Sequence, residues 1–135
     1  MNATISNLVD AMNAHDAERM AASLTPDYRS EQPAHPNRGF GGRDTVAGLW
    51  DQLYQAVPDM VCEVVATADD GSTVWAEWHW HGHYSDGSPF ESRGVTISRL
   101  TEDGLISGQR LYIEQVEQDG AGIEESERQL REPAH

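Results

Sequence analysis

Residues 74–84 read VWAEWHWHGHY, and two chemical classes of side chain alternate along the segment. Successive side chains of a β-strand point to opposite faces, so a strand would separate these classes. One face is apolar and aromatic, with Trp78 and Trp80 near its centre, while the other carries His79, His81 and His83. Such a strand predicts a pocket wall, a metal site or a subunit interface.

The same alternation continues on both sides of this segment and predicts a sheet. Turns containing Asp and Gly at residues 69–71, 85–87 and 102–104 separate the alternating runs, as in consecutive hairpins. The predicted strands cover approximately residues 61–67, 73–84, 90–100 and 105–116. The second half of the chain is therefore expected to form an antiparallel meander.

The first half of the chain has helical spacing instead. Apolar residues at i, i+3, i+4 and i+7 from Ile5 to Met12 predict an amphipathic helix. Asp16 is the expected N-cap of a second helix, which ends before Pro26. Residues 28–32 are compatible with a short strand.

A third helix precedes the meander. Residues 33–43 are rich in Pro and Gly and predict a loop, after which Asp44 can cap a helix that Pro58 stops. Three helices followed by an antiparallel meander predict an α+β fold with the helices on one face of a curved sheet. We expect a single domain over residues 1–116 and an acidic tail, 117–135, that frays or forms a short helix.

The charge and the single cysteine limit the class of protein. A formal net charge of −14 argues against nucleic acid and anionic membranes as partners, because both would repel the chain. Cys62 has no cysteine to pair with in the chain, so an intrachain disulfide is excluded. No signal-peptide pattern or membrane-spanning apolar run is present, so we expect a soluble, cytoplasmic protein.

Five short sequence strings add information about the fold. They are NAHD at 13–16, PDY at 26–28, GRD at 42–44, PDM at 58–60 and EDGLI at 102–106. In order and spacing, over roughly residues 3–116, they resemble the nuclear transport factor two-like superfamily, which includes ketosteroid isomerases and SnoaL-like polyketide cyclases. The resemblance implies three N-terminal helices on a mostly antiparallel sheet, a cone-shaped ligand cavity between them, and a homodimer through the outer sheet face.

The catalytic groups of ketosteroid isomerases are missing at the matching positions. Their Tyr donor on the first helix corresponds to Leu8, and their general base, an Asp before Pro, corresponds to Gln32. Their protonated Asp falls near Thr96, which is at best a weak hydroxyl donor. Isomerisation by that mechanism is therefore not expected.

The catalytic residues of two other groups of relatives are also replaced at the matching positions of this chain. The acid/base Asp of SnoaL-like cyclases corresponds to Leu111, and only Glu114 matches their second acidic position. Limonene-epoxide hydrolases need an Arg and an Asp where Trp78 and Trp80 stand. This comparison suggests that the tryptophan face points inward and that the pocket is apolar and aromatic.

The candidate site combines one possible base with a set of cavity contacts. Glu31 is the first candidate general base and Gln32 a hydrogen-bond donor beside it; for Glu31 with Arg29, the alternative is an exposed ion pair that contributes little. If Glu31 is the base, Glu31→Gln abolishes turnover without unfolding the chain. The residues expected to contact a ligand are Arg29, Trp50, Leu53, Trp78, Trp80, Thr96, Leu111 and Ile113.

Histidines two residues apart on a strand can chelate a metal ion. In cupins, however, His-x-His is followed by Glu within a few residues, whereas here the next Glu after His81 is Glu91, beyond a turn. With the tryptophans inward, His79, His81 and His83 face solvent or a second subunit. We therefore expect no metal and no cofactor, and keep a metal-binding strand as the less favoured alternative.

Two classes of function remain open. The first is a cofactor-independent cyclase, isomerase or dehydratase that acts on a small apolar, oxygenated molecule. The second is a non-catalytic ligand-binding or accessory protein that forms a dimer. A SnoaL-like protein that binds a ligand is slightly favoured, because every recognised catalytic position has been replaced.

Overall fold

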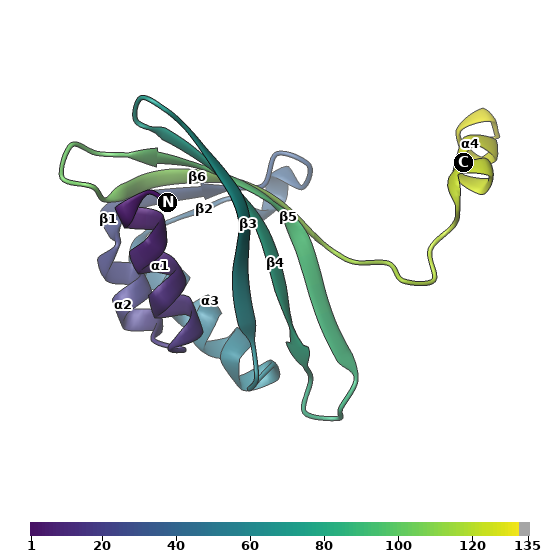
Figure 1. Cartoon of the computed structure of the whole chain (residues 1–135), viewed down its shortest axis with the longest axis horizontal. Helices are drawn as coiled ribbons and strands as arrows, with labels where there is room; N and C mark the ends of the chain where they lie inside the picture. Colours follow the sequence, from purple (N-terminus) through teal and green to yellow (C-terminus); the bar gives the residue numbers. More distant parts are fainter. Residues whose placement is uncertain (133–135) are drawn as a thin grey trace.

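Six strands form one curved sheet in the order β2-β1-β6-β5-β4-β3 (Figure 1). The computed structural model describes residues 1–132, so the end of the predicted tail, 133–135, lies outside the described residues. Adjacent strands are antiparallel except β1 and β6, which are parallel. The strands are β1 (Leu24–Glu31), β2 (Phe40–Gly41), β3 (Val61–Asp70), β4 (Thr73–His83), β5 (Pro89–Leu100) and β6 (Ile106–Gln115).

Three helices cover one face of this sheet, which confirms the predicted α+β fold (Figure 1). They are α1 (Ala3–Asn13), α2 (Ala17–Ala22) and α3 (Arg43–Ala56), and a short 3-10 turn, Pro36–Arg38, precedes β2. The apolar spacing identified these helices correctly because it marks the side of each that packs on the sheet.

Two of the helix starts have side-chain caps. Asn2 Oδ1 accepts hydrogen bonds from the backbone N–H groups of Thr4 and Ile5, and Asp16 accepts one from Arg19 as predicted. The prediction for α3 was wrong by two residues. Gly42, at φ 94°, is the N-cap, and Asp44 lies in the first helical turn, where its charge favours the positive end of the helix dipole.

The turn between α1 and α2 joins the helices to the edge strand β3. The Asn13 side chain donates to the carbonyl of Cys62 at 2.9 Å and accepts from the N–H of Cys62 at 2.8 Å. His15 has a positive φ of 54°, stacks on Tyr54, and its Nε2 lies 2.8 Å from the carbonyl oxygen of Met60. These contacts fix the turn between the two helices against β3 and the residue before it.

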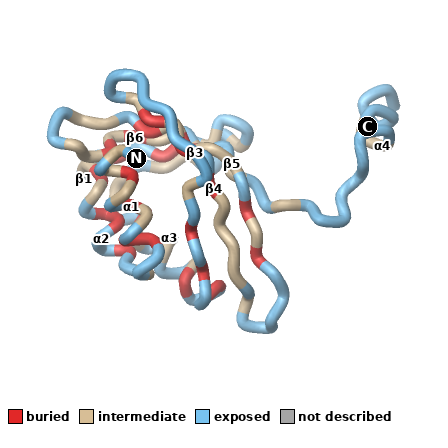
Figure 2. Tube along the Cα trace, in the orientation of Figure 1, coloured by how far each residue is buried: buried red, intermediate tan, exposed pale blue. Residues whose placement is uncertain are grey.

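The hydrophobic core lies between the helices and the inner face of the sheet. Figure 2 shows that buried positions recur along α1, α2 and the central strands, with exposed positions between them. On β4 the buried residues are Val74, Ala76 and Trp78, and Trp78 is only 1% exposed. The tryptophan face of residues 74–84 therefore points inward and the histidine face outward.

The first two strands depart most from the sequence prediction. The strand predicted at 28–32 begins at Leu24 and passes through Pro26, because the pairing of β1 with β6 is irregular between Leu24 and Arg29 and needs no N–H from the proline. The predicted loop 33–43 contains β2, which pairs Phe40 with Ser30 and Gly41 with Arg29. Together these strands close one end of the sheet.

The tail forms a helix, α4 (Ile123–Arg131), that lies apart from the sheet (Figure 1). None of its residues is buried, and Ile123 and Leu130 are 75% and 82% exposed. Within residues 1–132, no helix has the length and apolar character needed to cross a membrane.

Candidate functional site

A cavity of about 210 Å³ lies between the three helices and the inner face of the sheet. Its walls combine the apolar sides of the helices with inward-facing residues of the strands. It reaches solvent beside α3, where Leu49 is 47% exposed. The lining residues are Leu8, Met12, Met20, Leu24, Tyr28, Ser30, Gln32, Phe40, Val46, Leu49, Trp50, Leu53, Trp78, Trp80, Thr96, Gln109 and Leu111.

Three tryptophans form one wall of the cavity. The ring of Trp80 packs edge-on against Trp50 of α3, with centroids 5.1 Å apart, and against its strand neighbour Trp78 at 5.9 Å. Aromatic pairs prefer edge-to-face packing of this kind. The result is a continuous aromatic surface that spans helix and sheet.

The polar groups of the cavity differ in whether they already have partners. Trp78 Nε1 donates to Thr96 Oγ1 at 2.9 Å, and the Tyr28 hydroxyl donates to Gln109 Oε1 at 2.7 Å. Gln109 in turn donates to Ser98 Oγ at 2.9 Å. Trp80 Nε1, in contrast, is buried without a hydrogen-bond partner among the described residues. A buried donor of this kind is costly unless a ligand or water accepts its proton.

The cavity has little capacity for acid–base chemistry. None of the lining residues, all within the described part of the chain, is an Asp, Glu, His, Lys or Arg. Its one phenol, Tyr28, is held in the neutral form, because burial raises its pKa to about 12. The site can therefore surround an apolar molecule and hydrogen-bond to neutral oxygens, but it lacks a carboxylate or imidazole that would take up a proton.

Seven of the residues singled out from the sequence line this cavity. They are Gln32, Trp50, Leu53, Trp78, Trp80, Thr96 and Leu111. Ile113 is partly buried and packs against the core but is not part of the lining.

Glu31 and Arg29 lie elsewhere. Because strand residues alternate, these two point away from the cavity that Ser30 and Gln32 face, and they line a second depression of about 110 Å³. Arg99 and Arg110 line the same depression. The two residues proposed as base and cation are therefore separated from the tryptophan wall by the sheet itself.

Sequence reasoning did not assign Tyr28 and Gln109 to the site. A signal for Tyr28 was available, because it is four residues before Gln32 and thus shares its face of a regular strand. No sequence signal marked Gln109. Its contact with Tyr28 depends on the parallel pairing of β1 and β6, and the two residues are 81 positions apart in the chain.

Solved structures described as ketosteroid isomerase-like and NTF2-like share this fold. The chain belongs to the SnoaL-like domain family, whose sequence profile matches residues 5–109. A comparison with curated proteins finds no match.

Solved structures of the same fold have low sequence identity to this chain. IdmH from Streptomyces antibioticus, a proposed polyketide cyclase, is 24% identical with a TM-score of 0.72, over 82% of this chain and 89% of IdmH. RV0760c from Mycobacterium tuberculosis, solved with estradiol-17beta-hemisuccinate, is 22% identical with a TM-score of 0.69, over 81% and 89%. SalBIII, an epoxide hydrolase/cyclase-like enzyme in pyran ring formation in polyether salinomycin, is 16% identical with a TM-score of 0.72, over 82% and 88%.

Proposed function

We propose that this protein binds a small, mostly apolar molecule that carries a neutral oxygen, in the cavity lined by Trp50, Trp78 and Trp80. The observation that carries the proposal is Trp80 Nε1, a buried donor without a partner among the described residues, in a wall that is otherwise apolar. A carbonyl, ether or hydroxyl oxygen of a ligand would accept this hydrogen bond. The structure of RV0760c with a steroid derivative adds support from the same fold.

The size of the cavity favours a compact ligand. Its volume of about 210 Å³ is below the range of about 300–1,000 Å³ that is usual for drug-sized ligands. Trp50, Leu53 and Leu111 would supply apolar contact area. Gln32, whose amide both donates and accepts, would contact a second oxygen of the ligand.

Binding without turnover is the version that the lining favours. Proton abstraction next to a carbonyl requires a base within hydrogen-bond reach of the substrate, and the lining holds no carboxylate or imidazole. The earlier candidate, Glu31, lines the depression on the other side of β1.

A matched pair of tryptophan variants tests ligand binding. Intrinsic fluorescence is recorded while the chain is titrated with the neutral cyclic ketones 1-tetralone and β-ionone. Trp80→Phe removes the Nε1 donor and retains an aromatic ring, so we expect affinity to fall by about 2- to 13-fold, the equivalent of one hydrogen bond of ~0.5–1.5 kcal/mol. Trp75→Phe, on the opposite face of the same strand, is the control and should not change affinity.

Two outcomes would contradict this proposal. One is the absence of a saturable fluorescence change with either ketone in the wild-type chain. The other is equal affinity in Trp80→Phe and wild type, which would show that the indole N–H does not contact the ligand.

A cyclase-type activity is the second candidate, and its support is the likeness to IdmH and SalBIII. In this cavity Tyr28 would exchange its hydrogen bond to Gln109 for one to a substrate carbonyl oxygen, which it would polarise as a neutral donor. Product formation from a candidate polyketide should then be lost in Tyr28→Phe and retained in Glu31→Gln. Retained turnover in Tyr28→Phe would remove this role of Tyr28.

We also propose a homodimer through the outer face of the sheet. That face carries an apolar group formed by cross-strand neighbours: Trp75 opposite Ile97, and Val95 opposite Tyr112. Tyr112 is 43% exposed, so this group is open to a partner in the single chain. Light scattering coupled to size exclusion should give twice the chain mass for wild type and the monomer mass for Val95→Glu; a monomeric wild type would contradict the proposal.

A further inference from the structure

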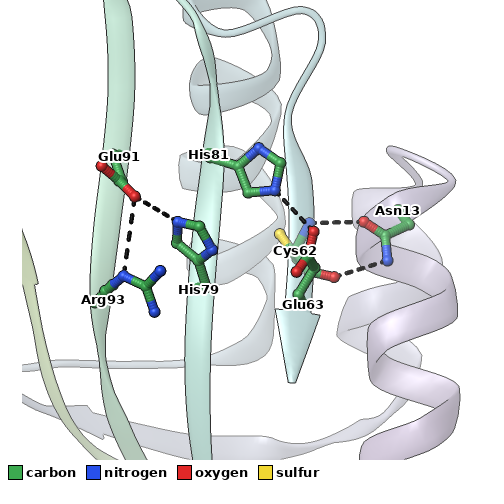
Figure 3. A network of polar contacts seen from close by, with 7 residues as sticks. All are labelled: Asn13, Cys62, Glu63, His79, His81, Glu91 and Arg93. Atoms are coloured by element: carbon green, nitrogen blue, oxygen red, sulfur yellow. Dashed lines mark hydrogen bonds and ion pairs between the residues drawn. The ribbon is translucent and has the colours of Figure 1, made fainter. Parts of the chain in front are cut away.

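The outer face of β3, β4 and β5 holds a cluster of histidines and carboxylates that the cavity does not use (Figure 3). Glu63 comes from β3, His79 and His81 from β4, and Glu91 from β5. His79 is opposite Glu63 and His81 is opposite Glu91 in the strand register. Carboxylates thus flank the two histidines from both neighbouring strands.

Three of these residues converge closely enough to share one ion. Glu63, His79 and His81 each offer one ligand atom, and the three atoms lie within 4.8 Å of one another. Ligands 2.0–2.1 Å from a tetrahedral Zn²⁺ are about 3.3 Å apart, so the three atoms would need to approach one another by at most about 1.5 Å. His81 Nε2 and Glu63 Oε1 are already 2.9 Å apart.

The fourth residue, Glu91, orients the His79 ring so that its other nitrogen is free to bind a metal ion. Glu91 Oε2 accepts a hydrogen bond from His79 Nε2 at 2.6 Å, and Arg93 Nε lies 3.9 Å from the same carboxylate oxygen. With its proton on Nε2, a neutral His79 has its lone pair on Nδ1. Figure 3 shows that this second ring nitrogen is on the side of the ring that faces β3. A carboxylate that orients a ligating histidine in this way is a regular feature of metal sites.

One side of the cluster is more buried than the other. The side chains of His79 and Glu91 are 18% and 27% exposed, whereas those of His81 and Glu63 are 37% and 56% exposed. The two imidazole rings pack with centroids 4.7 Å apart. This packing brings two imidazole groups side by side, as binding of one ion by both histidines requires.

The carboxylate of this site is not on the histidine strand, so the pattern along that strand does not reveal it. Glu63 precedes His79 by 16 residues, and only the pairing of β3 with β4 brings them together. A strand bulge between Val64 and Ala66 adds a register shift that the sequence does not reveal.

We propose that Glu63, His79 and His81 bind one divalent transition-metal ion of the Zn²⁺ type, with Glu91 positioning His79. Two histidines and one glutamate leave a fourth coordination position for water or an exogenous ligand. This site is on the opposite side of the sheet from the tryptophan-lined cavity. Its test is therefore independent of the proposed ligand.

The experiment is a calorimetric titration of the tag-free, full-length chain with ZnCl₂ in a buffer that does not chelate metals. We expect one Zn²⁺ per chain. Binding should be lost in the His79→Asn/His81→Asn double variant, weakened at least about tenfold in Glu63→Gln, and weakened about 10- to 100-fold in Glu91→Gln, which loses the orienting carboxylate. The visible absorption of bound Co²⁺ gives an independent readout of tetrahedral coordination.

His83→Asn is the matched control. It is on the same strand and the same face, and it also pairs with a carboxylate, Asp59, at 2.7 Å, but it is outside the cluster. Its Zn²⁺ affinity should equal that of wild type. No binding by wild type, binding that persists in the double variant, or an equal loss in His83→Asn would each overturn the proposal. Circular dichroism of each metal-free variant verifies that it is folded.

Discussion

The indole N–H of Trp78 donates to the hydroxyl of Thr96 across β4 and β5, at 2.9 Å and in the buried wall of the cavity. Both residues are at most 2% exposed, so the bond lies away from the outer surface of the chain. Thr96→Val keeps the shape of the side chain and removes the acceptor. We expect the free energy of unfolding to fall by about 1–3 kcal/mol, the cost of a buried donor left without a partner.

Urea denaturation measures this change, and Thr96→Ser is the control because it retains a hydroxyl at the same position. Equal stability of the Val variant and wild type would show that the bond does not contribute. Since Trp78 lines the cavity, the Val variant also tests whether the tryptophan wall keeps its ligand affinity when one ring is released.

Gly94 on β5 has no room for a side chain beside β6. A Cβ added at this position would lie 2.0 Å from the carbonyl oxygen of Tyr112 on β6, and that atom belongs to the backbone and has little freedom to move. Gly94→Ala should therefore lower the free energy of unfolding by at least about 2 kcal/mol. Thermal or urea unfolding of the purified variant measures this loss.

The control for Gly94 is Gly48→Ala on α3. A Cβ there meets no atom within 4 Å, and replacing a helical glycine with alanine typically stabilises by about 0.5–1 kcal/mol. The two variants make the same chemical change and are expected to act in opposite directions. If Gly94→Ala were as stable as wild type, the close approach of β5 to β6 would not be a constraint on the fold.

Asn13 joins α1 to the edge strand through two hydrogen bonds with the backbone of Cys62. Asn13→Ala removes both, and we expect a loss of about 1–3 kcal/mol in the free energy of unfolding. Amide hydrogen exchange should show increased exchange at Cys62. The comparison variant is Asn7→Ala on the same helix, an exposed position for which no such change is expected. Unchanged exchange at Cys62 in Asn13→Ala would contradict this role.

Most of the fold could be predicted because its signals are local. Alternation in residues 74–84 marks the two faces of β4, and helical spacing from Ile5 to Met12 marks the buried side of α1. Both patterns depend only on neighbours within about two turns or a few strand positions. The short β2 lacked such a signal, because Phe40 and Gly41 form a strand only through pairing with β1.

Several residues that line the cavity could be predicted from the sequence, but the polar contacts between side chains could not. Alternation requires Glu31 and Gln32 to face opposite sides of β1, but it does not tell which side is inward; the helices decide that. Long-range pairing creates the other polar contacts: Tyr28 meets Gln109 through β6, and Glu63 meets His81 through β3. Such contacts depend on strand order and register, which are properties of the folded sheet.

Tyr28 makes stability sensitive to alkaline pH. Burial raises its pKa to about 12 in the folded chain, above the ordinary value of 10.0. A raised folded-state pKa means that folding favours the protonated phenol, so this contribution is fully present below pH 10 and is lost as the pH rises from about 10 to 12. A pKa difference of this size corresponds to roughly 3 kcal/mol of stability.

Urea denaturation at several pH values between 9 and 12 measures this loss. The decline in stability across that interval should be smaller in Tyr28→Phe, which has no ionisable phenol at this position. The same decline in Tyr28→Phe as in wild type would show that Tyr28 ionises in the folded chain much as it does in the unfolded one, and that the cavity does not hold its hydroxyl in the neutral form.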